Sequence, residues 1–259
     1  WATATGRRPD NQDRAAVADG WVMVSDGAGG LRGGAQAAAL TVAAAVARLG
    51  ASADRMDDRV VREAVQDANA AVRSGQRDDP TVAFMAATLT LAALAADRAA
   101  GSLWLVAGVG DSPAWLVTSE RVTRITDDDN AAAELVRAGV ISRAEARTHP
   151  GRHMITRAMG AAEVVTPDVA HVALFPGDAL VLASDGIDAL DEAEIGCIVR
   201  SARSADSAAQ RLVDAALDAV VSVEARAGLR DVRVRMPRGQ LRHAQHPEHF
   251  PRRRSGRKQ

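Results

Sequence analysis

Hydrophobic positions recur with helical spacing in two segments of the first third of the chain. Between Asp57 and Ser74 they return every three or four residues, at Val60, Val61, Val65, Ala68 and Val72. Ala35 to Leu49 is an alanine-rich apolar run that stops at Gly50. A helix with one apolar face buries that face against another layer of structure. We therefore predict two amphipathic helices packed on a sheet.

Short runs rich in β-branched and apolar residues predict strands along the rest of the chain. These runs are Trp21–Ser25, Thr88–Leu94, Leu103–Val109, Ala114–Thr118, Val122–Thr126, Asp168–Leu174 and Ala179–Ser184. Turn sequences such as Gly110-Asp111-Ser112-Pro113 and Pro176-Gly177-Asp178 separate several of them. Because such short turns join antiparallel neighbours, we predict a meander and not a doubly wound parallel sheet.

Residues Asn130 to Gly160 interrupt the strand pattern with two short helical pieces, Ala131–Arg137 and Ser142–Arg147. The second piece opens with the capping-box spacing of a serine followed three residues later by Glu145. We interpret the whole segment as a mobile flap.

The carboxyl-terminal part changes character after Pro237. Before it, we predict a long helix over Ala205–Ala227 and a strand candidate over Asp231–Met236. After it, the chain is basic and lacks apolar periodicity. We therefore predict one domain over residues 1–236 and a basic, disordered tail over residues 237–259.

Composition and charge narrow the function classes. With 259 residues and 47% hydrophobic positions, the chain can build one substantial layered core. The formal net charge of -1 gives no general attraction to nucleic acid or anionic membranes, and a nucleic-acid role for the tail would rest on one short arginine run. Cys197 is the only cysteine, so no disulfide forms within the chain, and we expect a cytoplasmic protein. The longest apolar stretch, Ala37 to Ala47, falls short of the roughly 20 residues of a transmembrane helix, so we expect no membrane association.

Three apolar runs each end at an aspartate followed by a small residue. These aspartates are Asp26, before Gly27, then Asp111 and Asp185. Carboxylates at the ends of neighbouring strands can converge, and a glycine beside them lets a backbone carbonyl approach a cation. An all-oxygen ligand set favours Mg²⁺ or Mn²⁺ over zinc. Each aspartate alone could simply mark a turn, but three after buried strands favour a metal site.

The glycine-rich sequence Gly27-Ala28-Gly29-Gly30 raises the alternative of a nucleotide-binding loop. Arg32 stands where the dinucleotide fingerprint needs its third glycine, and no glycine-lysine pair follows for a nucleotide P-loop. Both nucleotide motifs are therefore excluded.

With these strand ends and several further motifs, the sequence resembles the metal-dependent protein serine/threonine phosphatases of the PPM (type 2C) family, bacterial type. The motifs run in the family's order from Gly6 to about Asp231. They are Gly6-Arg7-Arg8-Pro9-Asp10-Asn11-Gln12-Asp13, Val24-Ser25-Asp26-Gly27-Ala28-Gly29-Gly30 with Gly33-Gly34, Ala87-Thr88-Leu89-Thr90, Gly110-Asp111-Ser112, Thr156-Arg157-Ala158-Met159-Gly160 and Leu182-Ala183-Ser184-Asp185-Gly186-Ile187. The resemblance implies an α+β fold, a four-layer αββα sandwich of two antiparallel sheets flanked by helices.

The resemblance also implies the metal ligands. Asp26 would bridge two Mn²⁺ or Mg²⁺ ions, with the Gly27 carbonyl on one ion and Asp185 on the other. Asp231 would be a terminal ligand, and Asp111 would help to bind a third ion.

Two further residues receive roles from the resemblance. Asp13 would hold metal-bound waters, and Arg8 would clamp the substrate phosphate with its guanidinium fork. Arg7 is the alternative clamp, but the spacing to Asn11 and Asp13 favours Arg8.

Three other residues attract attention for their chemistry. His149 and His153 lie in the flap, and we expect both to be surface histidines. We expect Cys197 to lie in a helical stretch as a small core residue.

The implied activity is hydrolysis of phosphomonoesters on phosphoserine and phosphothreonine proteins. A water activated by a dinuclear Mg/Mn site would attack the phosphorus, with no covalent phosphoenzyme. The resemblance further implies a signalling role in which the protein opposes a serine/threonine kinase.

The family's final motif is altered in this chain. The family has aspartate, asparagine, an apolar residue and threonine, whereas this sequence reads Asp231-Val232-Arg233-Val234. Alternating arginines are atypical of a buried strand, so the sequence leaves open whether this strand candidate forms. This leaves a second hypothesis open, a catalytically weak or inactive phosphatase-like binding module.

Overall fold

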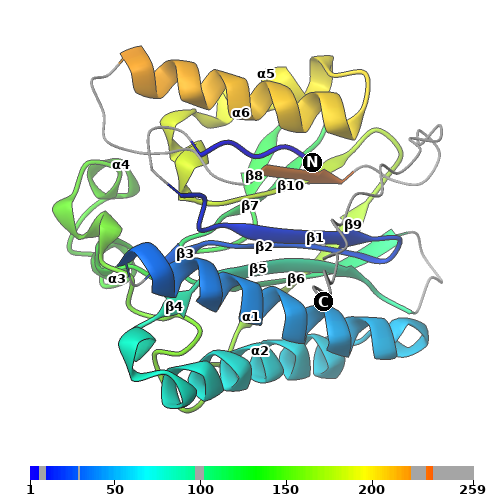
Figure 1. The fold of residues 1–259 in the computed structure, drawn as a ribbon. Helices are drawn as coiled ribbons and strands as arrows, with labels where there is room; N and C mark the ends of the chain where they lie inside the picture. Colours follow the sequence, from blue (N-terminus) through cyan, green and yellow to red (C-terminus); the bar gives the residue numbers. More distant parts are fainter. Residues whose placement is uncertain (6–9, 29, 97–101, 223–231, 236–259) are drawn as a thin grey trace, which may run out of the picture.

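The computed structural model describes residues 1–5, 10–28, 30–96, 102–222 and 232–235. Two antiparallel sheets lie face to face, with a pair of helices on each outer face (Figure 1). The five-stranded sheet has the order β1 (Arg14–Ala18), β2 (Trp21–Ser25), β5 (Leu89–Leu94), β6 (Ser102–Val109) and β9 (Asp168–Leu174). The four-stranded sheet has the order β11 (Val232–Arg235), β10 (Ala179–Ala183), β7 (Ala114–Val117) and β8 (Val122–Arg124). A short ladder joins β3 (Gly27–Ala28) to β4 (Ala86–Ala87).

Two helix pairs complete the four layers. The long pair α1 (Gly30–Ala51) and α2 (Asp58–Asp78) covers the five-stranded sheet, and the pair α5 (Glu192–Ser201) and α6 (Ala205–Ser222) covers the four-stranded sheet. The short helices are α3 (Ala131–Arg137), α4 (Arg143–Ala146), η1 (Ala53–Arg55), η2 (Pro80–Val82), η3 (Pro150–His153) and η4 (Asp185–Ala189). The predicted αββα sandwich is confirmed.

Alternating side chains on the central strands fill separate layers of the core. On β2, Trp21 and Met23 pack toward the long helix pair, whereas Val22 and Val24 pack between the two sheets. Successive side chains of a strand point to opposite faces, so a strand covered on both faces is apolar throughout. This arrangement explains why β2 reads as a continuous apolar run.

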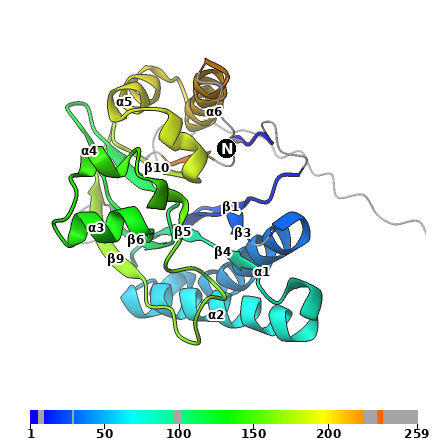
Figure 2. The same cartoon turned by 90° about the vertical axis from the view of Figure 1, so that its left-hand side faces the viewer.

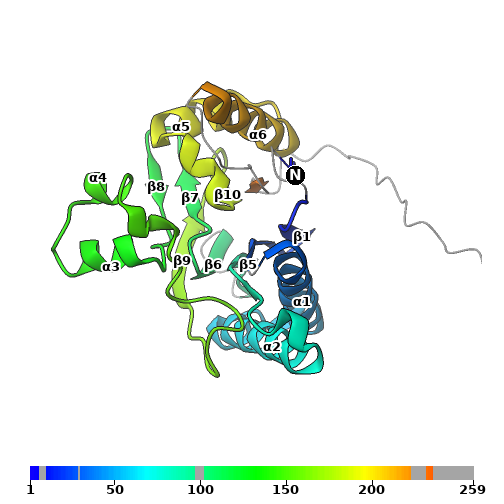
Figure 3. The same cartoon turned by 60° about the vertical axis from the view of Figure 1, so that its left-hand side comes forward.

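The predicted flap projects from one side of the sandwich. It contains α3, α4 and η3. Figure 3 shows α3 and α4 beside β8 and β9, away from the helix pairs, and Figure 2 shows α3 next to β9. The capping box of Ser142 and Glu145 is present at α4, as predicted.

Most predicted elements occur within a few residues of their expected bounds, and β2, β9 and α3 have the predicted bounds. The last strand candidate forms over Val232–Arg235, where β11 pairs antiparallel with β10. The predicted long helix ends at Ser222, and residues 223–231 lie outside the described residues.

Cys197 corrects one expectation, because it is exposed and not part of the core. Ile195 and Val199 on the same helix are buried. They are four residues apart and share the inner face of α5. Cys197, midway between them in the sequence, therefore lies on the opposite face of the helix.

One stretch of α1, Gly33–Ala51, is long and apolar enough to cross a membrane by length and composition alone. It exceeds the apolar run noted in the sequence because the helix extends that run at both ends. In this fold 33% of the stretch is buried, including Ala37, Ala45 and Leu49 in the core shared with α2.

Candidate metal centre

Asp26 follows β2 and is held through its backbone. Its N–H donates to the Thr88 hydroxyl at 2.9 Å, and its carbonyl accepts from the Thr88 N–H at 2.8 Å. The hydroxyl of Ser25, the last residue of β2, donates to the Thr88 carbonyl at 2.6 Å. Asp26 itself is 6% exposed. These bonds fix the direction in which β2 presents the Asp26 carboxylate.

A hydrogen bond between the two sheets brings further predicted residues to the same end of the sandwich. Asp13 and Asp26 are the next residues beyond the last pair of the β1–β2 ladder. The Ser184 hydroxyl, at the end of β10 in the other sheet, donates to Asp13 Oδ2 at 3.1 Å. Asp185 follows directly. Asp13, Asp26 and Asp185 therefore gather where the two sheets meet.

The turn after β6 carries Asp111 into this region. The Ser112 hydroxyl is 2.6 Å from the Thr88 hydroxyl, and the Thr90 hydroxyl donates to the Ser112 carbonyl. Thr88 thus links the Asp111 turn to the Asp26 backbone. All of these polar groups are buried, so their hydrogen bonds hold the site in one arrangement.

The carboxylates of this region repel one another. Burial, followed by the negative charges of Asp185 and Asp128, raises the pKa of Asp111 to about 8. Burial likewise raises the pKa of Asp128 to about 6, against the opposing effect of Arg124. Desolvation also raises the pKa of Asp188, and Asp185 adds to it. Because the Asp188 side chain reaches solvent, water screens part of this effect.

This cluster fits divalent cations. Carboxylates crowded together in a buried region oppose each other's ionisation, and a bound cation favours the ionised form. The donors are oxygen atoms, as Mg²⁺ and Mn²⁺ prefer. Arg124 supplies part of the balancing positive charge, because it forms an ion pair with Asp128. Its guanidinium carbon also lies 5.6 Å from the Trp115 ring centroid.

Two predicted site residues cannot be placed. Arg8, the expected phosphate clamp, and Asp231, the expected terminal ligand, lie outside the described residues. Within the described ranges, no three His, Cys, Asp or Glu side chains form a group ready to hold a metal ion. The structure thus brings Asp13, Asp26, Asp111 and Asp185 to one region of the fold, without a closed set of ligands.

Asp188 and Asp128 also lie in this region, in addition to the residues predicted from the sequence. Asp188 follows Asp185 by three residues in η4, and residues three apart lie on one side of a 3₁₀ helix. That spacing in the sequence could have indicated that Asp188 lies beside Asp185. Asp128 follows no predicted strand directly and carried no comparable sign.

The arrangement has a counterpart among known proteins. A family model described as protein phosphatase 2C matches residues 7–232. The chain belongs to the protein phosphatase 2C family. The match includes the positions of both Arg8 and Asp231.

Individual relatives agree with this assignment. A putative protein phosphatase 2C-type of Streptococcus pyogenes is 34% identical over 201 residues, which cover 75% of this chain and 78% of that protein. The structure of the PPM Ser-Thr phosphatase MsPP from Mycobacterium smegmatis, in complex with cacodylate, is similar with a TM-score of 0.75 at 36% identity, covering 90% of this chain and 94% of that one.

A further similar structure contains metal. It is the catalytic domain of the serine threonine protein phosphatase PstP in complex with 2 manganese ions, with a TM-score of 0.73 at 26% identity, covering 90% of this chain and 95% of that one. The predicted family, the class of enzyme and the Mn²⁺ or Mg²⁺ cofactor are thereby confirmed.

Gly27, the predicted carbonyl ligand in this phosphatase 2C fold, touches Gly34 so closely that neither position accepts a side chain. A Cβ on Gly27 would lie 2.0 Å from the Gly34 carbonyl oxygen. A Cβ on Gly34 would lie 2.7 Å from the Gly27 carbonyl oxygen and 2.4 Å from Gln12 Oε1. Because Gly34 belongs to α1, this contact seats the Gly27 carbonyl against the start of the helix.

Gly34→Ala should lower Mn²⁺-dependent hydrolysis of p-nitrophenyl phosphate by roughly a hundredfold, because displacement of an active-site group by about 1 Å can cost that much. Gly50→Ala is the matched control. It lies in the same helix with nothing within 4 Å of its Cβ, and helix propensity favours alanine there. Wild-type activity in Gly34→Ala would show that the Gly27 carbonyl need not lie where it does.

The flap histidines differ in their surroundings. His149 is partly buried, and its Nδ1 accepts from the Gly151 N–H at 3.0 Å at the start of η3. His153 is exposed, and its Nε2 is 2.9 Å from Arg152 Nε. The expectation of a surface histidine therefore holds for His153, whereas His149 is a helix cap.

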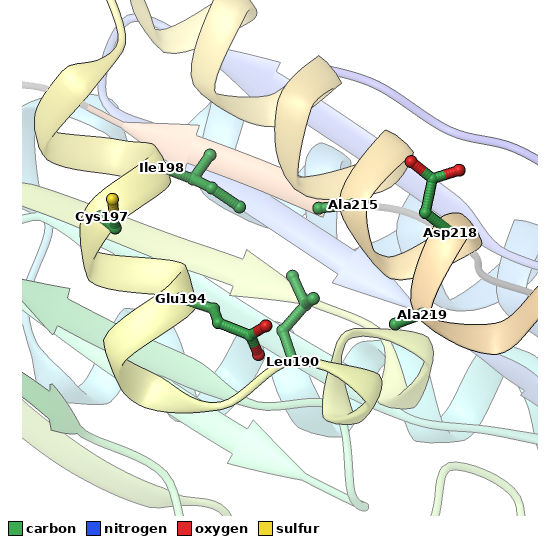
Figure 4. A pocket seen from close by; sticks show the side chains of 7 residues that line it. All are labelled: Leu190, Glu194, Cys197, Ile198, Ala215, Asp218 and Ala219. Atoms are coloured by element: carbon green, nitrogen blue, oxygen red, sulfur yellow. The ribbon is translucent and has the colours of Figure 1, made fainter. Parts of the chain in front are cut away.

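A cavity of about 500 Å³ lies between α5 and α6 (Figure 4). Its lining residues are Leu190, Glu194, Cys197, Ile198, Ala215, Asp218 and Ala219. None of these lining residues is a predicted metal ligand or the predicted phosphate clamp. The cavity belongs to the outer helix layer and not to the metal centre.

Proposed function

We propose that this chain hydrolyses phosphoserine and phosphothreonine in proteins, with Asp26, Asp185, Asp231 and the Gly27 carbonyl as the ligands of two Mn²⁺ or Mg²⁺ ions. Asp111 would help to bind a third ion. The observation that supports this best is the group of mutually repelling carboxylates around the buried Asp111 and the half-buried Asp185 at the junction of two sheets. It occurs in a phosphatase 2C fold with a manganese-bound relative.

The chemistry that bound cations supply here is acidification of water and neutralisation of phosphoryl charge. The chain's own residues would orient the attacking water and the substrate phosphate. Asp13, which accepts a hydrogen bond from Ser184, would hold water at the edge of the centre. Arg8 would bind two phosphoryl oxygens with its planar guanidinium. In these roles, the two residues would let water reach the phosphorus without a covalent phosphoenzyme.

The setting of this activity is a further part of the proposal. Relatives in Listeria are named serine/threonine phosphatase, with 28% identity over 205 residues in Listeria innocua. We propose that the chain acts in the cytoplasm on phosphoproteins and opposes a serine/threonine kinase. Its near-neutral charge is compatible with protein substrates and gives no support to nucleic acid as a partner.

A phosphothreonine peptide should be hydrolysed in the presence of Mn²⁺ and not after treatment with a chelator. Asp185→Asn should lower the rate at saturating Mn²⁺ by roughly tenfold or more, because it removes a charged ligand at the metal centre. The measurement is release of inorganic phosphate.

Asp218→Asn makes the same chemical change on α6, in the outer helix layer, and should leave the rate unchanged. A folded wild-type protein without Mn²⁺-dependent turnover would overturn the proposed activity and favour a phosphatase-like binding module.

A further inference from the structure

The two ends of the flap meet at one buried aspartate. The Asp129 carbonyl accepts from the Thr156 N–H at 2.8 Å, and Asp129 Oδ2 accepts from Arg157 Nε at 2.8 Å. An isolated β-bridge between Asn130 and Ile155 continues this pairing. Asp129 precedes α3 and Arg157 follows η3, so this junction closes the base of the flap.

The same aspartate holds the residue next to Asp111. The Gly110 N–H donates to Asp129 Oδ2 at 2.9 Å, and the Gly110 carbonyl accepts from the Asp129 N–H at 2.9 Å. Gly110 has φ of +99°, a conformation that favours glycine. On its other side, a Cβ would lie 2.6 Å from Thr88 Cγ2. Gly110 is therefore fixed between the flap base and the threonine that holds Asp26.

Arg157 is itself oriented by three acceptors. Besides Asp129, its guanidinium donates to the Thr166 carbonyl at 2.7 Å and to Asp168 Oδ2 at 2.8 Å. The Arg157 side chain is 32% exposed and that of Asp129 is 8% exposed, whereas that of Asp168 is 91% exposed. The ion pair between Arg157 and Asp129 is therefore the stronger of the two, because it is less exposed to solvent.

We propose that Asp129 and Arg157 are positioning residues that set the Asp111 carboxylate for its cation and tie this position to the base of the flap. The proposal rests on the proposed function in one respect, the assignment of Asp111 as a metal ligand. Asp129 acts through both backbone groups of Gly110, and Arg157 acts by holding Asp129. Groups that orient metal ligands from outside typically affect metal affinity by roughly 10- to 100-fold when replaced.

The test is a titration of Mn²⁺ followed by electron paramagnetic resonance of the free ion, which needs no turnover. Asp129→Ala and Arg157→Met should raise the dissociation constant of the weakest Mn²⁺ site roughly tenfold or more. Arg157→Lys keeps the charge without the planar fork and should recover part of that loss. Asp168→Asn is the control, because it alters only the exposed arm of Arg157 and should bind Mn²⁺ as the wild type does.

A double variant separates positioning from general damage. Asp111→Asn alone should show the same weakened site, and adding Arg157→Met should cause no further loss of Mn²⁺ affinity, since both changes act on one ion. Circular dichroism without metal identifies any variant that fails to fold, and Arg157→Lys then carries the comparison.

Wild-type Mn²⁺ binding in folded Asp129→Ala and Arg157→Met would overturn the proposal, even if both were slow phosphatases. Additive losses in the double variant would overturn it as well. A wild-type protein that bound Mn²⁺ without hydrolysing the peptide would count against the proposed function alone, because the binding titration still decides the role of Asp129 and Arg157.

Discussion

Asp26→Ala should lower Mn²⁺-dependent hydrolysis by roughly a thousandfold or more. Charge stabilisation by metal ions contributes several kcal/mol to such reactions, and a loss of about 4 kcal/mol corresponds to a thousandfold. Asp26 is the proposed ligand of both ions, so its loss affects both. The measurements are steady-state hydrolysis of p-nitrophenyl phosphate and of a phosphothreonine peptide over a range of Mn²⁺ concentrations.

The fold should survive this substitution. The Asp26 N–H and carbonyl keep their hydrogen bonds to Thr88 whatever the side chain is. The variant should therefore unfold cooperatively without metal, and the rise in Tm that Mn²⁺ gives the wild type should shrink or disappear. Asp218→Asn on α6 should retain that rise. An Asp26→Ala protein with an undiminished Mn²⁺-dependent rise in Tm would place the ions elsewhere.

The strand ends could be predicted because each is marked by a short, continuous sequence pattern. In the β2 region, a continuous apolar run stops at Asp26 and Gly27, and both the burial of the strand and the location of the carboxylate follow from that pattern. The β10 region repeats it with Asp185. β1 was missed because Arg14–Ala18 consists mostly of alanine, which gives little strand preference.

A helical stretch around Cys197 was expected, and it corresponds to α5, but the start of this helix was not predicted although the sequence contained a sign of it. Asp191 and Glu194 form a capping box at its start, the same spacing that correctly predicted α4. With this start known, Ile195 and Val199 define the inner face of the helix, and Cys197 would have been expected on the exposed face.

The junction of Asp129 and Arg157 could not be predicted from local pattern. The two residues are 28 positions apart, and neither lies in a periodic segment. The Arg157 motif was visible in the sequence, but the partner of its guanidinium follows from the way the flap folds back on itself. Contacts of this kind depend on tertiary structure, which hydrophobic periodicity does not encode.

A chain that ends after residue 222 should lose activity and cooperative unfolding, whereas a chain that ends after residue 236 should keep both. β11 pairs with β10 from Leu180 opposite Arg235 to Ala183 opposite Val232. Without β11, β10 would become an open edge strand at the end that presents Asp185, and open edges favour aggregation. The longer chain retains the domain that we predict over residues 1–236 and lacks only the basic tail.

Thermal unfolding by circular dichroism and Mn²⁺-dependent hydrolysis distinguish the two truncations. Asp231→Ala in the full chain separates the strand from the ligand, because it should weaken Mn²⁺ activation while leaving metal-free unfolding unchanged. An active chain ending at residue 222 would remove both β11 and Asp231 from the required parts of the enzyme. Inactivity of the chain ending at residue 236 would instead assign residues 237–259 to the working domain, because the pairing of β11 with β10 would then not be enough to complete it.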